Sequence, residues 1–263
     1  MLCTTLASGS KGNCFFIEGE SGALLIDAGL SVKETLRRMA AADLDAGKIC
    51  AVLVTHEHGD HIRGLEVLMK KLNIPAYATA GTLKDFMHNR RTSDKPIDCR
   101  VCRHDEEFTV GDFSIEAFKT SHDAVEPCGF VIKENGLRFG YCTDTGILNH
   151  QMLEKLRRCN GIVLESNYCP DMLANGPYPE FLKQRIRSKR RGHLSNKAAA
   201  DGMRLLGKDL PQVILAHLSE TNNTPERVTA SARDGLGLLY DEMNMIIATQ
   251  CGTTKACPQQ LSL

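Results

Sequence analysis

The chain has 263 residues, of which 42% are hydrophobic and 24% charged, and its formal net charge is zero. Such a composition is typical of a globular domain. No apolar run approaches the roughly 18 residues of a membrane span, and we see no basic segment followed by an apolar core, as in a secretory signal peptide. The net charge would not attract a polyanion. The 11 cysteines, an odd number, indicate a reducing compartment, and we predict a cytoplasmic protein without a membrane partner.

Short apolar strands alternate with turns at the start of the chain. We predict strands over residues 2–6, 14–18 and 23–26. Residues 8–13 form a glycine-rich loop between the first two strands, but this loop lacks the P-loop order of residues. Ser31 is the predicted N-cap of a helix that ends near Ala41, with Glu34 at the capping-box position.

The most informative segment is residues 55–61, Thr-His-Glu-His-Gly-Asp-His, which follows an apolar strand over residues 51–54. A helix with apolar residues at helical spacing is predicted over residues 62–72. Imidazole and carboxylate are donors that Zn²⁺ and Mn²⁺ favour, and this segment offers enough of them to begin a site for two cations. The protease pattern H-E-x-x-H is excluded, because no glutamate lies between His58 and His61.

The remaining chain continues as alternating helices and strands without a linker. We predict strands at 76–79, 129–133, 137–142, 161–164, 212–216 and 243–248, and one or two strands over 110–118. Helices are predicted at 82–88, 147–158 and 179–189, from about 192–196, and from 224–226. Asn135-Gly136 predicts a hairpin turn. Residues 1–250 are therefore interpreted as one domain with two sheets packed face to face and covered by helices, and residues 251–263 as a loose C-terminal tail.

Polar residues follow apolar strands at several widely separated positions. These residues are Asp27, His56, His122, Asp144 and His217. Loops at one rim of a sheet converge, so we expect these side chains to share one site.

Two further patterns have less specific readings. Residues 183–191 carry six cations and no acid, which is usually a solvated face and alternatively a nucleic-acid contact. Cys99-x-x-Cys102 has no second cysteine pair nearby, so we interpret it as structural rather than as a zinc site.

Motifs along the whole chain resemble the YycJ/WalJ group of metallo-β-lactamase-fold nucleases, which is related to ribonuclease Z and the β-CASP nucleases. These motifs are LASGSKGN, LLIDAGLS, THEHGDH, TSHDA, TDTG, LESNY, GHLSN and AHLSETNN. The resemblance implies an α/β fold, the four-layer αββα sandwich of a single domain, with its site at the rim between the sheets. It also implies phosphodiester hydrolysis, and for this group a 5′-to-3′ exonuclease acting on DNA.

The resemblance implies two divalent metal ions, zinc or manganese with iron also possible, and a ligand set for them. One ion would take His56, His58 and His122, the other Asp60, His61 and His217, with Asp144 bridging both and Asp27 supporting them. A hydroxide between the ions would attack phosphorus. Asp60, Glu165 and His193 are the implied catalytic residues, with His193, held by Glu165, protonating the leaving oxygen.

Substrate contacts are expected from the glycine-rich loop and from the basic run that leads into His193. The predicted substrate-binding residues are Ser8, Asn13, Arg185, Arg187, Arg190, Arg191 and His193. The interval between Asp144 and His217 is too short for a β-CASP insertion, which argues against a messenger-RNA-processing enzyme.

Several other functions remain open from the sequence. The same metal site suits a small-molecule or cyclic phosphodiesterase, or a nuclease that acts on RNA. A non-catalytic nucleic-acid-binding module that uses metal only for folding is a different class, and a thiol-ester or lactone hydrolase is a weaker candidate. The oligomeric state is not determined by the sequence.

Overall fold

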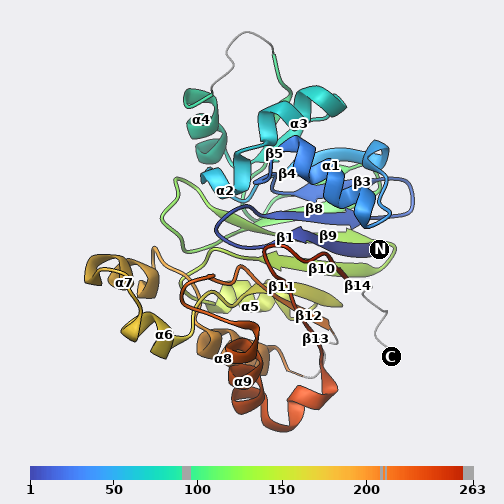
Figure 1. The fold of residues 1–263 in the computed structure, drawn as a ribbon. Coiled ribbons are helices and arrows are strands. Elements are labelled where there is room, and N and C mark those ends of the chain that lie inside the picture. Colours follow the sequence, from blue (N-terminus) through green and yellow to red (C-terminus); the bar gives the residue numbers. More distant parts are fainter. Residues whose placement is uncertain (91–95, 208–209, 211, 257–263) are drawn as a thin grey trace.

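Two mixed sheets stack face to face, with helices on both outer faces, in the computed structural model, which describes residues 1–90, 96–207, 210 and 212–256 (Figure 1). The four-layer αββα sandwich and the single domain implied by the resemblance are confirmed. None of the helices in these ranges combines the length and the apolar composition that crossing a bilayer requires.

The first sheet has seven strands in the order β14-β1-β2-β3-β4-β5-β6. Its strands are β1 (Leu2–Ala7), β2 (Cys14–Glu18), β3 (Ala23–Ile26), β4 (Ile49–Leu53), β5 (Ala76–Ala78), β6 (Cys99–Val101) and β14 (Thr254–Ala256). The outer face is covered by α1 (Val32–Ala41), α3 (Leu65–Leu72) and α4 (Ala80–His88), and the short α2 (Gly59–Ile62) lies at the rim (Figure 1).

The second sheet also has seven strands, in the order β13-β12-β11-β10-β9-β8-β7. Its strands are β7 (Glu107–Val110), β8 (Phe113–Lys119), β9 (Cys128–Glu134), β10 (Leu137–Cys142), β11 (Gly161–Glu165), β12 (Gln212–Ala216) and β13 (Asn244–Ile247). Its helices are α5 (His150–Leu156), α6 (Pro170–Asn175), α7 (Glu180–Arg187), α8 (Asn196–Leu206) and α9 (Pro225–Leu236). The β9–β10 hairpin is as predicted, with φ of 49° at Asn135 and 78° at Gly136.

Alternation along the strands explains why both faces of each sheet are apolar. In β2, Phe15 and Ile17 enter the core between the sheets, whereas Cys14 and Phe16 enter the core beneath the helices. Phe15 stacks on Phe139 of the opposite sheet, with ring centroids 5.6 Å apart and planes at 13°. A third core joins the second sheet to its own helices. Packing on both faces holds the strand ends, and therefore the rim, in place.

The continuous helix predicted for residues 62–72 is wrong. α2 ends at Ile62 and α3 begins at Leu65, with Gly64 between them. Gly64 N donates to Ala28 O at 2.8 Å, and a Cβ at Gly64 would lie 2.0 Å from Leu30 O. Only glycine allows the two loops to approach so closely, and this contact separates α2 from α3.

The predicted loose tail is partly ordered. Thr254–Ala256 forms β14, which pairs antiparallel with β1 in the register Thr5↔Thr254. This short strand covers an edge of β1 that would otherwise present unpaired backbone groups. Residues 257–263 lie outside the described residues. Sequence patterning also gave no sign of β6 or α6, which are only 3 and 6 residues long.

Candidate metal centre

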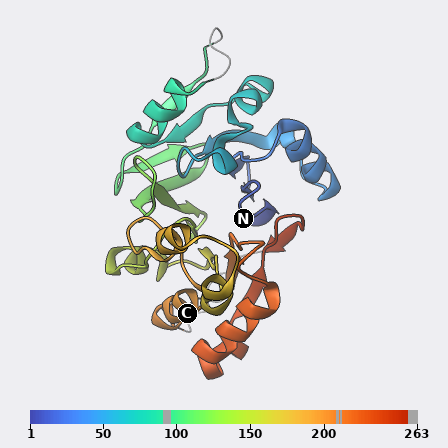
Figure 2. The ribbon, with the colours of Figure 1, turned by 60° about the vertical axis from the view of Figure 1, so that its left-hand side comes forward.

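The histidine-rich segment turns from β4 into α2 at the rim, which lies on the left of Figure 1 and comes forward in Figure 2. His56 follows the strand, His58 is the N-cap of α2, and Asp60 and His61 lie within α2. His61 N donates to His58 O at 2.8 Å. A single tight turn therefore presents four potential ligands from one short stretch of backbone.

Three residues at strand ends reach the site from a left-handed backbone conformation. The φ angles are 61° at Asp27, 54° at Asp144 and 58° at His217. Non-glycine residues seldom adopt this conformation, which costs on the order of 1 kcal/mol or more per residue. The surrounding fold thus holds a strained backbone at three residues that the sequence analysis predicted to belong to the site.

The first donor group consists of His56, His58 and His122, whose ring nitrogens lie within 4.8 Å of one another. His122 Nδ1 donates to Gly192 O at 3.0 Å, so its Nε2 carries the lone pair that faces His58 Nδ1 at 3.3 Å. His56 Nε2 is buried and has no hydrogen-bond partner. Three imidazoles therefore bring one ring nitrogen each to a common point.

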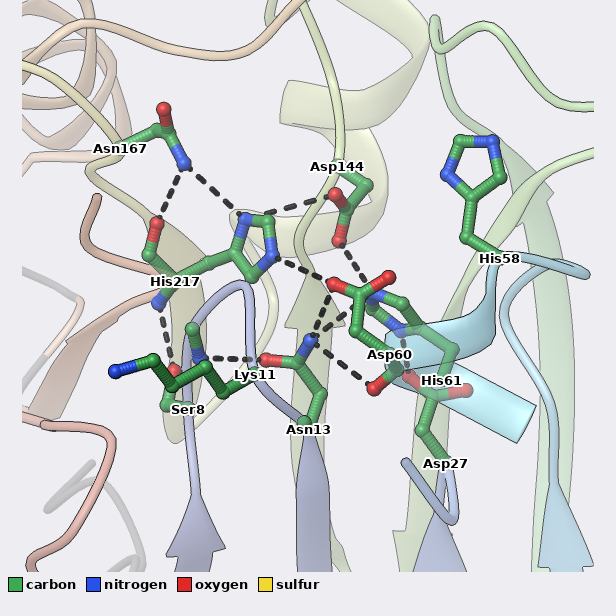
Figure 3. A network of polar contacts seen from close by, with 12 residues as sticks. Ser8, Lys11, Asn13, Asp27, His58, Asp60, His61, Asp144, Asn167 and His217 are labelled. Carbon is green, nitrogen blue, oxygen red and sulfur yellow. Dashed lines mark hydrogen bonds and ion pairs between the residues drawn. The ribbon is translucent and has the colours of Figure 1, made fainter. Parts of the chain in front are cut away.

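The second donor group consists of Asp60, His61 and His217, again within 4.8 Å of one another (Figure 3). His61 Nδ1 donates to Asp27 Oδ2 at 2.8 Å, which fixes the proton on that nitrogen and leaves Nε2 for the site. His217 Nε2 lies 3.7 Å from Asp60 Oδ2 and has no hydrogen-bond partner. Asp27 thus orients a potential ligand, the supporting role that the resemblance implies for it.

Asp144 lies between the two groups (Figure 3). Its Oδ2 is 3.4 Å from His61 Nε2, and its Oδ1 is 3.7 Å from His122 Nε2. The carboxylate is 3% exposed, and Oδ2 accepts no hydrogen bond. One carboxylate in contact with both groups has the placement that a bridging ligand needs.

The unpartnered atoms test whether the site fits metal ions. Buried polar atoms normally have partners, and leaving one without a partner costs about 1–3 kcal/mol. His56 Nε2, His217 Nε2 and Asp144 Oδ2 are all buried at the rim without a hydrogen bond. Divalent cations would satisfy these atoms together, and imidazole and carboxylate are suitable donors. The donor set therefore fits divalent metal ions.

Carboxylates set the pKa values of the two histidines in the second donor group. Burial acts against the charged forms of His61 and His217. Asp27 and Asp144 nevertheless hold the pKa of His61 well above its usual range. Asp144 leads the groups that raise the pKa of His217 to about 10. His56 differs, because burial and the neighbouring imidazoles hold its pKa well below the usual range.

Binding of Zn²⁺ or Mn²⁺ to the metal-free protein is expected to release protons and to strengthen as pH rises from 6.5 to about 10. His217 holds a proton across this window, and a cation must displace it. The same proton stabilises the metal-free fold below pH 6.5, and this contribution is lost as pH rises through about 10. Titration calorimetry in two buffers of different ionisation enthalpy counts the protons; a pH-independent affinity without proton release would contradict the prediction.

Asp27→Ala is expected to lower the free energy of unfolding by about 3 kcal/mol. Asp27 is fully buried, and besides His61 it binds Thr55, whose N donates to Oδ1 at 2.9 Å. Removing the carboxylate leaves these groups without a partner. Asp43→Ala is the matched control, because exposed Asp43 has nearly the same φ, 57°. Urea denaturation compares the two variants, and equal losses would mean that the backbone alone accounts for the effect.

Glu165 and His193 meet beside the metal centre. Glu165 is fully buried, and its Oε1 accepts from His193 Nδ1 at 2.6 Å. The same oxygen accepts from His217 Nδ1 at 3.0 Å, while Oε2 accepts from the backbone N of Thr145 and of Leu194, each at 3.0 Å. Burial acts against the charged form of Glu165, but the charge of His193 and the hydrogen bonds from His193 and His217 hold the pKa of Glu165 low. Glu165 therefore orients a potential ligand as well as His193, a double contact that the sequence did not predict.

Two other polar residues of the site were missed by the sequence analysis. Asn167 Nδ2 donates to His217 O at 2.8 Å and so helps to fix that residue (Figure 3). Thr55 Oγ1 bonds Asp27 and lies 3.0 Å from His56 Nδ1. Asn167 follows the end of β11 by two residues, the same placement as other site residues, so its position could have been read from the sequence.

The glycine-rich loop has a different role from the one predicted. Ser8 Oγ accepts from His217 N at 2.7 Å, and Asn13 Nδ2 lies 3.0 Å from His61 Nε2; both side chains are buried. Gly9 N donates to Asn13 Oδ1, and Lys11 N donates to Gln250 Oε1. The side chains of Ser8 and Asn13 and the amides of Gly9 and Lys11 are thus used inside the fold, whereas exposed Ser10 lines the cavity at the metal centre. Ser8 and Asn13 position the centre, and the prediction that they contact substrate is not supported.

The basic run divides between different surroundings. Arg185 and Arg191 line a cavity of about 280 Å³ together with His58, Asp60, His122, Asp144, His193 and His217. Arg190 lines a neighbouring cavity. Arg187 is outside both cavities and lies 3.6 Å from Glu180 of its own helix. Lys183 is 9% exposed and donates to Ala174 O at 2.7 Å. The substrate-binding prediction therefore suits Arg185, Arg190 and Arg191 but not Arg187.

Comparison with known proteins agrees with this geometry. Residues 23–218 match the family described as the beta-lactamase superfamily domain. The chain is 37% identical over 225 residues to Exodeoxyribonuclease YycJ of Bacillus anthracis, covering 85% of this chain and 84% of the relative. It is 38% identical over 224 residues to Exodeoxyribonuclease WalJ of Streptococcus pneumoniae, covering 84% and 82% respectively.

A solved structure gives the same fold at low sequence identity. The metallo-beta-lactamase fold protein YhfI from Bacillus subtilis matches with a TM-score of 0.74 and 18% identity, over 97% of this chain and 99% of that one. The fold and the donor groups at its rim define a metal-dependent hydrolase of the beta-lactamase superfamily. Within that superfamily, the chain belongs to the group that contains YycJ and WalJ.

Proposed function

We propose that this protein is a two-metal phosphodiesterase that removes nucleotides from the 5′ end of DNA in the cytoplasm. The observation that carries the proposal is the meeting of two donor groups at Asp144, in a cavity that also holds His193 and two arginines. DNA is favoured because the relatives at 37% and 38% identity are named exodeoxyribonucleases. No disulfide forms among the ten cysteines in the described ranges, which supports a reducing compartment.

Two divalent cations, zinc or manganese with iron as an alternative, would be held by the groups described above. One would bind His56, His58 and His122, and the other Asp60, His61 and His217, with Asp144 touching both. Bound there, the cations would supply a nucleophile from water near neutral pH and neutralise charge on the phosphate oxygens. Asp27, Glu165 and Asn167 hold the ligand side chains in position.

His193 is the proposed acid for the leaving oxygen. Its Nδ1 is engaged by Glu165, so Nε2 is available to carry a proton toward the cavity that His193 lines. The hydrogen bond to the buried Glu165 carboxylate fixes the orientation of the ring, as the role of an acid requires. Proton transfer to the 3′ oxygen would leave a free hydroxyl on the departing nucleotide.

Arg191 is proposed to contact the substrate phosphate, whereas Arg187 is not. Arg191→Glu is expected to raise the KM for DNA about 10-fold or more, because it places a carboxylate where a phosphate should lie. Hydrolysis of bis(p-nitrophenyl) phosphate should change much less, because that substrate has no neighbouring phosphates. Arg187→Glu, in the same basic run, serves as the control. Equal effects of both substitutions on DNA would show that only the net charge of the run matters.

Digestion of end-labelled single- and double-stranded DNA and RNA by the metal-reconstituted protein tests the proposed function. Release of mononucleotides from the 5′ end of DNA is the expected result. Preferential digestion of RNA would make the protein a ribonuclease on the same metal site. Hydrolysis of bis(p-nitrophenyl) phosphate without digestion of either polymer would indicate a small-molecule phosphodiesterase. Inactivity on all of them, with metal bound, would leave a binding module or a hydrolase of another ester.

A further inference from the structure

A second cavity, of about 430 Å³, lies beside the metal centre. It is formed mainly by residues 119–127, the end of β8 and the loop that joins β8 to β9, which Figure 1 shows at the rim near α2 and α7. Its lining includes Lys119, Thr120, Ser121 and Arg190. Lys119, Thr120 and Ser121 do not line the cavity at the metal centre.

The two cavities adjoin one another. His122 lines both of them, and Arg190 in the second cavity is followed directly by Arg191 in the first. A molecule that occupies the metal centre and extends past His122 therefore enters the second cavity. A small diester would end before it, whereas a nucleic-acid strand continues.

The second cavity has an unbalanced positive charge. Within the described ranges, neither Lys119 nor Arg190 makes a side-chain ion pair, in contrast to Arg185, which binds Asp123 Oδ2 at 2.5 Å. The one acid in the lining, Glu126, is already engaged, because its Oε2 accepts from Gly81 N at 2.6 Å. Two exposed cations therefore share the lining with one acid, and neither forms an ion pair with a residue that the structure describes.

Two residues with hydroxyl groups, Thr120 and Ser121, share this lining with the cations. Ser121 N and O are both bonded to the chain, by Thr145 Oγ1 and Gly146 N, which fixes the backbone of this residue. Thr120 is 2% exposed, and its Oγ1 has no hydrogen-bond partner. Cations with hydroxyl donors beside them are the groups that bind phosphate oxygens.

We propose that the second cavity binds a phosphate group of the DNA strand next to the one being cleaved. This inference rests on the proposed function and adds a substrate contact to it. The phosphate has two possible sources, a 5′-terminal monophosphate or an internal diester of the strand. Both offer the anionic oxygens that Lys119 and Arg190 recognise, and they differ in whether the contact depends on the chemistry of the end.

Lys119→Gln, Arg190→Gln and the double variant test the proposal. The substrates are one single-stranded oligodeoxynucleotide with either a 5′-phosphate or a 5′-hydroxyl, labelled at its 3′ end, and bis(p-nitrophenyl) phosphate. The Kd for each oligonucleotide is measured by fluorescence anisotropy, and KM and kcat by hydrolysis. Lys33→Gln, which removes an exposed lysine from α1, is the control for lost charge.

The double variant is expected to weaken oligonucleotide binding about 10-fold or more, and Lys119→Gln alone to weaken it while bis(p-nitrophenyl) phosphate hydrolysis stays unchanged. Loss only with the 5′-phosphorylated strand identifies a terminal phosphate, and equal loss with both strands identifies an internal diester. Affinities equal to those of Lys33→Gln would overturn the proposal. If the parent protein hydrolyses none of the substrates, the proposed function fails, while the anisotropy comparison still decides whether the cavity binds phosphate.

Discussion

Asp144→Asn is expected to lower hydrolysis of DNA and of bis(p-nitrophenyl) phosphate by about 10³-fold and to reduce the amount of bound metal. The carboxylate lies 3.4 Å from His61 Nε2 and 3.7 Å from His122 Nε2, so both donor groups lose a negatively charged oxygen. Asparagine tolerates the φ of 54° at this position, so the fold should persist. Elemental analysis measures the metal content. Hydrolysis of bis(p-nitrophenyl) phosphate measures turnover.

A neutral substitution elsewhere provides the control for Asp144→Asn. Asp234→Asn removes an exposed carboxylate on α9 and should keep full activity and metal. Circular dichroism and the unfolding temperature in excess chelator show whether the Asp144 variant is folded. Full activity with an unchanged metal content in that variant would remove Asp144 from the centre.

His193→Ala is expected to lower kcat by about 10²-fold or more while the metal content stays the same. His193 is in neither of the two three-residue donor groups. Its Nδ1 lies near Asp144 and could join a donor group with Asp144, Glu165 and His217, but it is already engaged by Glu165 at 2.6 Å. Glu165→Gln should differ, because Glu165 also holds His217 at 3.0 Å. We therefore expect the Glu165 variant to lose metal affinity as well as turnover.

The comparison of these two variants separates proton transfer from metal binding. An activated diester such as bis(p-nitrophenyl) phosphate has a good leaving group and needs little protonation. The loss caused by His193→Ala should therefore be larger for DNA than for this substrate. Equal losses on both substrates, or loss of metal from His193→Ala, would contradict the proposed role of an acid.

Much of the site could be predicted because its residues stand where strands end. Asp27, Asp144 and His217 are separated widely in the sequence, yet each follows a buried strand, and the sheets bring the strand ends to one rim. The short motif from His56 to His61 added donors at the same rim. Periodicity and strand-end position together were enough to anticipate this convergence, since both depend on local sequence.

The errors arose where side-chain direction depends on tertiary contacts. Ser8 and Asn13 look like phosphate-binding loop residues, but their partners, His217 and His61, come from distant segments. Lys183 lies in a run of cations, yet its Nζ donates to the carbonyl of Ala174 in α6. The break at Gly64 likewise comes from a loop that is remote in sequence. Local pattern gives no information on such contacts.

Each of the two donor groups draws its members from both sheets. His58 and Asp60 come from the half of the chain that builds the first sheet, whereas His122 and His217 follow strands of the second. A pair of cations would therefore clamp one sheet to the other across the open end of the sandwich. Chelation should then lower the stability of the whole molecule as well as abolish its activity. The melting temperature should rise with the concentration of free metal.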